Sequence, residues 1–388
     1  MTPKVVHAHI GSSKTGTTFI QQALWANKAA LDSNHILVPG DRRRQQGDAA
    51  RALNRWSSGD PTPEAWRTIA DEIVSSSHPV SLLSQEFLCW LDAEQIQQFV
   101  GRLRRSDVKV VLTTRDLARL IPAQWQSALR QGRTWTLTEY SNAVAGLEPR
   151  GNRHPAYVHF WKRQDYGGIV RRWMDAIGRD NVTVVTLPRS GSDPDELWRR
   201  FCASIELDAD RYPTKGVRNT SLGAASAEVL RRLNGTDAIE GLERNDYARE
   251  VNGRLTRHVL DPRRPKEPGL TLPTGQRDWV VGKSEQIIAE LEASGVKVIG
   301  SLDELRSEVD AKPYVAPEET SDDELLAAAM DALAGYAVEH GERRADFESK
   351  KKVKAQSERT ERRAARAAEA AQSPGGQRRK NAGRRKGK

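Results

Sequence analysis

The residues with the clearest chemical potential lie near the start of the chain, in the run GSSKTGTT from Gly11 to Thr18. An apolar, β-branched segment over 4–10 precedes this run and predicts a buried strand, and helical spacing of apolar residues follows it. The run is therefore expected to form a tight turn between a strand and a helix. Such a turn directs backbone N–H groups inward at the positive end of a helix dipole, which suits an anion. Lys14 adds a full positive charge, and Thr17 and Thr18 add hydroxyl donors.

The run differs from the phosphate-binding loop of nucleoside-triphosphate enzymes, GxxxxGK[ST]. Gly11 and Gly16 have the spacing of that pattern, but Thr17 occupies the position of its lysine, and Lys14 precedes the second glycine. A lysine at this place would approach a different part of a polyphosphate. ATP or GTP hydrolysis is therefore disfavoured, and a P-loop-like kinase or NTPase stays as an alternative. An ordinary strand–turn–helix connection with capping threonines is the other alternative.

The core Lys14-Thr15-Gly16-Thr17-Thr18 resembles the phosphosulfate-binding loop of the PAPS-dependent sulfotransferases, which reads Lys-[Ser/Thr]-Gly-Thr-Thr. The resemblance implies that these five residues bind PAPS (3′-phosphoadenosine 5′-phosphosulfate) as the sulfuryl donor, and that no metal is needed. It also implies an α/β fold with three layers. We expect a P-loop-like arrangement in which a central, mostly parallel sheet of about five strands is flanked by helices.

A later part of the chain strengthens this resemblance. A helix containing Phe160-Trp161 is followed by a valine-rich strand over 181–188, and then by a helix containing Leu197-Trp198. This order is similar to that in the bacterial, especially actinobacterial, branch of the sulfotransferases. Apolar spacing predicts that the first of these helices runs unbroken over 160–177.

Glu86 stands at the end of a predicted strand over 79–86. In an open parallel sheet, ligands bind beyond the carboxyl ends of the strands, so Glu86 is expected to face the same crevice as Lys14. The resembled enzymes carry their catalytic base at this strand end. The resemblance therefore implies that Glu86 is the base and that Lys14 is the second catalytic residue. A helix cap or an ion pair is the structural alternative for Glu86.

Arg115 ends another predicted strand, over 108–114. The planar fork of an arginine can hold a phosphate with two hydrogen bonds. The resemblance implies that Arg115 binds the 3′-phosphate of PAPS, whereas an ion pair or cap formed with Asp116 is the alternative. The resembled enzymes have a serine eight residues further on, and here Ala123 occupies that position. Ser127, one helical turn later, is the available substitute.

A basic loop later in the chain contains Lys215, Arg218 and Asn219. The resembled enzymes close a basic loop over the 3′-phosphate, which implies that these three residues bind the cofactor. A capped loop is the alternative. Two histidines on the first strand, His7 and His9, are expected to be core residues bonded to the backbone, with orientation of the loop as a further option for His9.

The 388 residues carry a net charge of +9, and the charge is unevenly distributed. Residues 343–388 contain 17 Lys and Arg against 5 Asp and Glu, so the remainder of the chain is close to neutral. We expect a sulfotransferase-like α/β domain over 1–310, a linker and accessory helix over 311–342, and a basic, disordered tail over 343–388. The tail could attract an anionic membrane surface or nucleic acid. A polyanion-binding protein that acts through this tail is thus another alternative function.

Cys89 and Cys202 are the two cysteines, and their separation gives neither a disulfide framework nor a zinc motif. No apolar run approaches the roughly 20 residues that a membrane span requires. We therefore expect a cytoplasmic protein without a transmembrane segment, with peripheral association at the inner membrane face left open. The acceptor of the sulfuryl group is expected to be a hydroxyl or amine of a small molecule, carbohydrate or lipid, and the sequence does not distinguish among them.

Overall fold

The computed structural model describes residues 4–54, 63–214, 221–308 and 314–372. The chain divides into two compact units, Met1–Ala328 and Ala329–Lys388. All of the predicted site residues that the structure describes belong to the first unit. The domain boundaries expected at residues 310 and 342 stay predictions.

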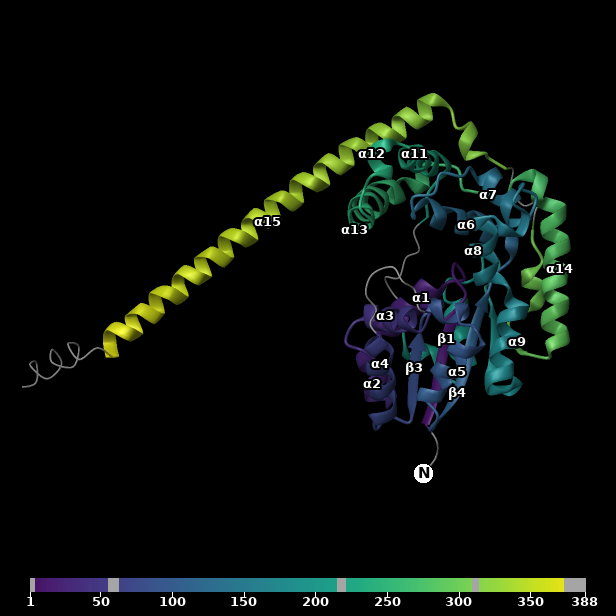
Figure 1. Cartoon of the computed structure of the whole chain (residues 1–388), viewed down its shortest axis with the longest axis horizontal. Coiled ribbons are helices and arrows are strands. Elements are labelled where there is room, and N and C mark those ends of the chain that lie inside the picture. The colour runs from purple at the N-terminus through teal and green to yellow at the C-terminus, as the bar shows by residue number, and fades with distance from the viewer. Residues whose placement is uncertain (1–3, 55–62, 215–220, 309–313, 373–388) are drawn as a thin grey trace, which may run out of the picture. The chain divides into compact units, whose positions relative to one another are not determined.

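A parallel sheet forms the centre of the first unit (Figure 1), and its order within the described residues is β2-β3-β1-β4-β5-β6. The predicted α/β fold is confirmed, with six strands in place of about five. The strands at the two edges, β2 and β6, are the shortest. The strands are β1 (Lys4–Gly11), β2 (Ile36–Leu37), β3 (Val80–Ser84), β4 (Ser106–Thr114), β5 (Val182–Thr186) and β6 (Lys297–Ile299).

Helices fill most of the connections between the strands. The α-helices are α1 (Thr17–Ala26), α2 (Lys28–Ser33), α3 (Arg43–Leu53), α4 (Pro63–Ser75), α5 (Ala93–Arg102), α6 (Leu117–Leu129), α7 (Leu137–Val144), α8 (Pro155–Gln164), α9 (Tyr166–Ile177), α10 (Glu196–Ser204), α11 (Ala224–Asn234), α12 (Asp237–Glu240), α13 (Arg244–Asp246), α14 (Arg277–Ser294) and α15 (Asp322–Gln372). Two shorter elements matter below, the 3₁₀ helices η1 (Glu86–Trp90) and η8 (Leu302–Leu305).

One face of the sheet packs against α1, α2 and α10. Side chains alternate along a strand, and the strand register directs Leu82, Val111 and Val185 to this face. There they join a buried cluster with apolar residues of the three helices. The helical members include Ile20, Leu24, Leu31, Trp198 and Phe201.

The other face lies under α5 and α9, and α4 stacks against α5. The rings of Trp66 and Phe99 are 4.7 Å apart and stacked, and Trp173 meets Phe99 edge to face at 5.6 Å. All three rings are buried. Aromatic pairs of this kind contribute roughly 0.5–1.5 kcal/mol each beyond the area that they bury. Layers on both faces therefore hold the strands, as expected for parallel strands that are apolar on both sides.

The strand order changes direction at the carboxyl ends of β1 and β4. These two strands are neighbours, but the chain leaves β1 toward β2 on one side and leaves β4 toward β5 on the other. Ligands of open α/β sheets bind at such a switch point. Helices α6 and α8 lie beyond this edge of the sheet (Figure 1).

The predicted helix over 160–177 is wrong, because the structure has two helices there. Helix α8 ends at Asp165, whose backbone angles (φ −74°, ψ 76°) lie outside the α-helical region. Its carboxylate then accepts a hydrogen bond from the Gly168 N–H at 3.1 Å and caps α9. The apolar spacing continues through the break, so periodicity alone cannot detect it. The break turns α8 back toward the loop that follows β1.

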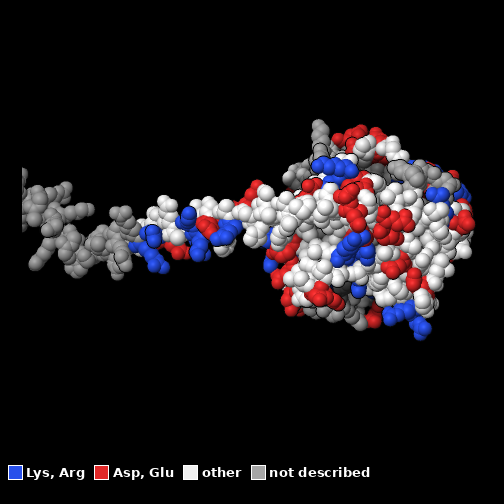
Figure 2. Space-filling view, turned by 90° about the horizontal axis from the view of Figure 1, so that it is seen from above, with Lys and Arg blue, Asp and Glu red and all other residues white. Residues whose placement is uncertain are grey.

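The segment predicted to be a disordered tail is helical as far as residue 372, since α15 is continuous over 51 residues. Ion pairs between residues four apart contribute to this, for example Lys350 with Asp346 at 2.7 Å. Each such pair adds only about 0.2–0.5 kcal/mol on an exposed helix. Figure 2 shows Lys and Arg interspersed with Asp and Glu both on the visible face of the first unit and along α15. Among the described helices, none has the length and apolar character needed to cross a membrane.

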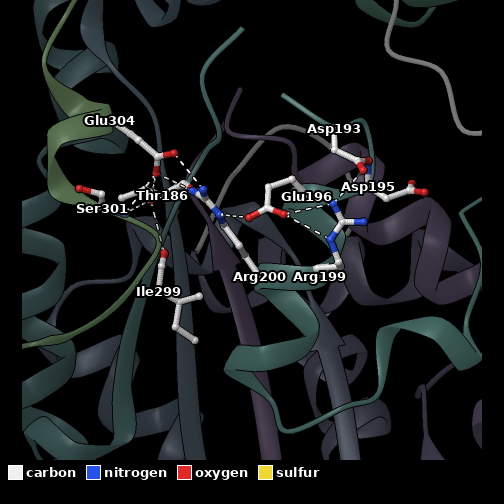
Figure 3. A network of polar contacts seen from close by, with 9 residues as sticks. All are labelled: Thr186, Asp193, Asp195, Glu196, Arg199, Arg200, Ile299, Ser301 and Glu304. Carbon is white, nitrogen blue, oxygen red and sulfur yellow. Dashed lines mark hydrogen bonds and ion pairs between the residues drawn. The ribbon is translucent and has the colours of Figure 1, made fainter. Parts of the chain in front are cut away.

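A polar network ties β5 to α10 and η8 (Figure 3). The Arg200 guanidinium donates to the Thr186 carbonyl at 3.1 Å, to Glu196 at 2.8 Å and to Glu304 Oε1 at 2.9 Å. The Ser301 N–H donates to Glu304 Oε2 at 3.2 Å. Although burial by itself would raise the pKa of Glu304, these hydrogen bonds and that from Thr186 together hold it below its ordinary value. The side chains of Arg200 and Glu304 are only 16% and 13% exposed, so the pair is shielded from water.

Replacing Glu304 by Gln keeps the shape of the side chain and removes its charge. We expect the free energy of unfolding to fall by about 1–2 kcal/mol at neutral pH. Because the fold lowers the pKa of Glu304, its contribution is complete above the unfolded-state pKa of about 4.3 and is lost as the pH falls through the folded-state value. Urea denaturation at pH 7 and in acid should therefore show that the gap between wild type and Glu304→Gln narrows in acid.

The matched control is Glu285→Gln, since Glu285 pairs with Arg306 where both side chains are about half exposed, 50% and 47%. This change is expected to alter stability by less than about 0.5 kcal/mol. A gap for Glu304→Gln that stays constant from neutral to acid pH would contradict the account of the network.

Candidate functional site

The loop between β1 and α1 has a left-handed backbone at three positions, Gly11 (φ 94°), Lys14 (φ 68°) and Gly16 (φ 85°). Glycine adopts this conformation without strain, whereas a lysine in it is uncommon. A side chain at Gly11 would also collide with Glu86, because an added Cβ would lie 2.8 Å from the Glu86 Cβ. The glycine therefore brings the backbone of the loop directly against Glu86.

The backbone N–H groups of residues 13–18 find no acceptor within the described parts of the chain. The neighbouring Ser12 N–H, by contrast, donates to the Thr113 carbonyl at 2.9 Å. Free N–H groups at the start of α1 carry the positive end of the helix dipole. The loop therefore presents a row of donors to an anion, as its sequence predicts.

A chain of hydrogen-bonded, buried polar side chains links β1, β3 and β4 to the loop. His9 Nδ1 contacts Ser84 Oγ at 2.7 Å, and His9 Nε2 contacts Thr113 Oγ1 at 3.2 Å. Thr113 Oγ1 lies 2.6 Å from Thr15 Oγ1, which donates to the Ser12 carbonyl at 2.6 Å. Burial lowers the pKa of His9 to about 3, so its ring is neutral. His9 is thus a core histidine, as expected, but its partners are side chains that lead to the loop.

Two glutamines hold the loop from the side. Gln164 on α8 accepts from Ser12 Oγ at 2.6 Å and donates to the Ser13 carbonyl at 2.9 Å. Gln124 on α6 donates to the same carbonyl at 3.2 Å. Both glutamines are buried, and α6 and α8 thereby fix the loop to the rest of the unit.

The Lys14 ammonium has no hydrogen-bond or ion-pair partner within the described residues. Its pKa is lowered to about 8, chiefly by burial and by the charge of Arg130, with a smaller contribution from Arg115. Glu86 and Asp261 act in the opposite direction. Arg130 is itself ion-paired with Asp261. An anion at the loop would relieve the charge repulsion on Lys14.

Arg115 lies beside Lys14, since its Nη1 donates to the Lys14 carbonyl at 3.1 Å. The Arg115 Nε is buried and lacks an acceptor in the described structure. Burial and the charge of Arg119 lower the pKa of the guanidinium. The cap half of the alternative is confirmed, because Asp116 caps α6 through the Arg119 N–H at 2.9 Å. The ion-pair half is wrong, because Asp116 pairs with the Arg119 side chain and not with Arg115. A buried guanidinium without a carboxylate partner is costly unless an anion binds it.

Glu86 begins η1, directly after β3, and its position is fixed by α1. Gln21 Nε2 donates to Glu86 Oε2 at 2.8 Å. Glu86 Oε1 has no partner among the described residues. The negative charge of Glu86 acts on both Lys14 and Arg163. One carboxylate oxygen is therefore held in place, and the other remains open to accept a proton.

The structure brings Lys14, Glu86 and Arg115 together at the carboxyl edge of β1, β3 and β4. Among the loop threonines, Thr18 is exposed and Thr17 is buried. The Thr15 hydroxyl is used inside the protein, so only the backbone of Thr15 can contact a ligand. The binding roles predicted for these residues and for Gly16 stay predictions.

The remaining predicted residues either bond within their own helix or lie outside the described residues. Lys215, Arg218 and Asn219 lie outside the described residues. Ser127, the substitute for the serine missing at Ala123, donates to the Ala123 carbonyl at 3.4 Å within α6. The hydroxyl hydrogen of Ser127 is therefore used within the helix.

Sequence reasoning missed the residues that position the loop and the base. Thr113 could have been recognised from the sequence, because a polar residue at the end of an otherwise apolar strand is expected at the edge of the sheet where ligands bind. Gln21 follows Thr17 by one helical turn and could have been placed on the same side of α1. Gln124 and Gln164 carry no such signal, since nothing local indicates that α6 and α8 fold back onto the loop.

Within the described residues, no group of three or more His, Cys, Asp and Glu side chains is arranged to hold a metal ion. No family model and no curated protein matches the chain. A crystal structure of a sulfotransferase from Alicyclobacillus acidocaldarius matches 64% of this chain and 100% of that chain, with 16% sequence identity and a TM-score of 0.37.

Proposed function

We propose that the protein transfers a sulfuryl group from PAPS to a hydroxyl or amine of an acceptor. The observation that carries this proposal is the concentration of unpaired donors at one loop. The N–H groups of residues 13–18, the Lys14 ammonium and the Arg115 Nε all lack acceptors within the described structure. The resemblance of the Lys14-to-Thr18 core to phosphosulfate-binding loops adds the identity of the anion.

The residues present fit a donor with two anionic groups. The loop N–H groups and Lys14 would hold the 5′-phosphosulfate, because they surround the start of α1. Arg115 would hold the 3′-phosphate, and its orphaned buried Nε supports this assignment. PAPS supplies an activated sulfuryl group, and the residues of this chain supply its binding and the stabilisation of charge.

Glu86 would accept the proton of the acceptor hydroxyl through its open Oε1 while Gln21 holds Oε2. The acceptor oxygen forms a bond to sulfur as the bond between sulfur and the 5′-phosphate oxygen breaks. The electron pair of the broken bond stays on the phosphate oxygen, where Lys14 and the loop N–H groups offset the new charge. A positioned general base contributes about 10²–10⁴-fold to such a step.

A P-loop-like kinase or NTPase is the alternative enzyme, and it shares the strand–loop–helix geometry. The two functions differ in the nucleotide that they bind. A sulfotransferase binds PAP, the product of PAPS, which carries a 3′-phosphate. A kinase or NTPase binds ATP together with magnesium. Binding of PAP without metal would favour the sulfotransferase, and magnesium-dependent binding of ATP without PAP binding would favour the kinase. Binding of anionic surfaces by residues 343–388 and a cytoplasmic location stay predictions.

The Lys14→Ala variant is expected to lose most of its affinity for PAP, measured by isothermal titration calorimetry. Because the pKa of free Lys14 is about 8, wild-type affinity should fall as the pH rises above that value and the amine loses its proton. This pH dependence should be absent from Lys14→Ala. Lys297→Ala, at an exposed position on β6, is the matched control. Unchanged PAP affinity in Lys14→Ala would contradict the role of Lys14.

The Arg115→Ala variant is expected to lose affinity for PAP by at least tenfold, since a charged hydrogen bond contributes about 1.5–3 kcal/mol. Affinity for AMP, which lacks the 3′-phosphate, should change much less. Titration of both nucleotides into both proteins gives the comparison. Equal losses for PAP and AMP would show that Arg115 does not contact the 3′-phosphate.

The Glu86→Gln variant is expected to bind PAP as the wild type does and to transfer sulfate about 10²–10⁴-fold more slowly. Single-turnover assays with labelled PAPS and an acceptor found by screening measure the rate. The neutral amide keeps the shape of the side chain and still accepts from Gln21, so a folding defect is not expected. Full activity of Glu86→Gln would remove Glu86 as the base.

A further inference from the structure

A second set of positive side chains surrounds His159 on α8. Burial and the charges of Arg163, Arg133 and Lys162 lower the pKa of His159. None of these three cations forms an ion pair with a carboxylate in the part of the chain that the structure describes. Many other arginines of the first unit are paired, for example Arg130 with Asp261. Cations that gather without carboxylates repel one another, and an anionic ligand would offset the repulsion.

Arg163 is the best placed member of this set. Its guanidinium lies over the Trp90 ring at 4.5 Å from the centroid. Trp90 ends η1, the element that begins with Glu86. The next residue on α8, Gln164, bonds the Ser13 carbonyl of the loop at 2.9 Å. Arg163 is therefore anchored between the element that carries the proposed base and the loop that carries the proposed donor site.

The two sets of cations are distinct, and Glu86 is the group that they share. The charges that act on Lys14 are those of Arg130, Arg115, Glu86 and Asp261. The groups that act on Arg163 are Tyr140, Cys89 and Glu86, and Lys14 is not among them. An acceptor whose hydroxyl reaches Glu86 would thus also come under the positive charge of Arg163.

We infer that Arg163 binds an ionised group of the acceptor, a carboxylate, sulfate or phosphate, so that the substrates are anionic alcohols or phenols. This inference rests on the proposed function, because Glu86 as the base fixes where the acceptor hydroxyl lies. The contact with the Trp90 ring restricts the movement of the guanidinium, whose planar fork can bind an anion through two parallel hydrogen bonds. Arg133, which lies over Trp135 at 5.3 Å, and Lys162 add positive potential that attracts an anion.

Binding to the PAP-saturated protein tests the inference with probes that differ by one ionised group. The pairs are para-hydroxyphenylacetate with its amide, glucuronate with glucose, and glycerol phosphate with glycerol. We expect the ionised member of at least one pair to bind about tenfold or more tightly than its neutral partner. Comparison of the carboxylate pairs with the phosphate pair identifies the preferred anion. Isothermal titration gives the affinities.

In the Arg163→Gln variant, the ratio of the affinities of the ionised and neutral members should fall to about one, while the affinity for PAP stays unchanged. Arg163→Lys should restore part of this ratio. Arg104→Gln is the matched control, because Arg104 is an exposed arginine elsewhere in the unit and its loss should change neither affinity. The PAP affinity of Arg163→Gln also reports on its folding. Gln164, the next residue, holds the loop that is proposed to bind PAP, so a misfolded α8 would lower this affinity.

Three results would overturn the inference, and the first two concern the wild type: equal or tighter binding of the neutral members, or no binding of any of the three anions while PAP binds normally. Preservation of the preference in Arg163→Gln would also overturn it. A protein that fails to bind PAP but binds an anion through Arg163 would contradict the proposed function and leave the anion site standing.

Discussion

The rest of the structure depends on the concentration of unpaired positive charge at the carboxyl edge of the sheet. Lys14 and Arg115 are partly or largely withdrawn from water, and neither has a carboxylate partner within the described residues. The fold keeps these two charges unpaired in two ways. It commits the nearby acids to other partners, so that Asp116 caps α6 and Asp261 pairs with Arg130. It also fixes the loop through neutral groups, which leaves its positive charge uncompensated.

The neutrality of the supporting groups is consistent with an anion site. Below the loop, His9 is uncharged because burial lowers its pKa to about 3, and its contacts are hydroxyls. At the side, Gln164 and Gln124 use amides to hold the Ser13 carbonyl. A carboxylate in any of these places would attract Lys14 and compete with a bound anion. Glu86 is the exception, and its negative charge is needed if it is to accept a proton.

The sequence predicts the parts of the site that are set by local pattern and by sheet topology. Lys14 belongs to a loop whose glycine spacing is recognisable in the sequence. Glu86 and Arg115 follow closely after β3 and β4, whose carboxyl ends meet at one edge of the parallel sheet. The remaining contacts depend on how distant helices fold back. The turn at Asp165 brings α8 to the loop, yet the apolar periodicity passes through it unchanged. The sequence could therefore not predict that Gln164 contacts the loop or that Arg163 contacts Trp90, although the structure shows both contacts.

Glu86 is a carboxylate that interacts with both groups of cations. Its charge acts on both Lys14 and Arg163, while Gln21 fixes only one of its oxygens. If the donor neutralises Lys14 and the acceptor neutralises Arg163, both attractions that hold the Glu86 charge in place weaken together. Glu86 would then be held chiefly by Gln21, which bonds one carboxylate oxygen and leaves the other open to an acceptor.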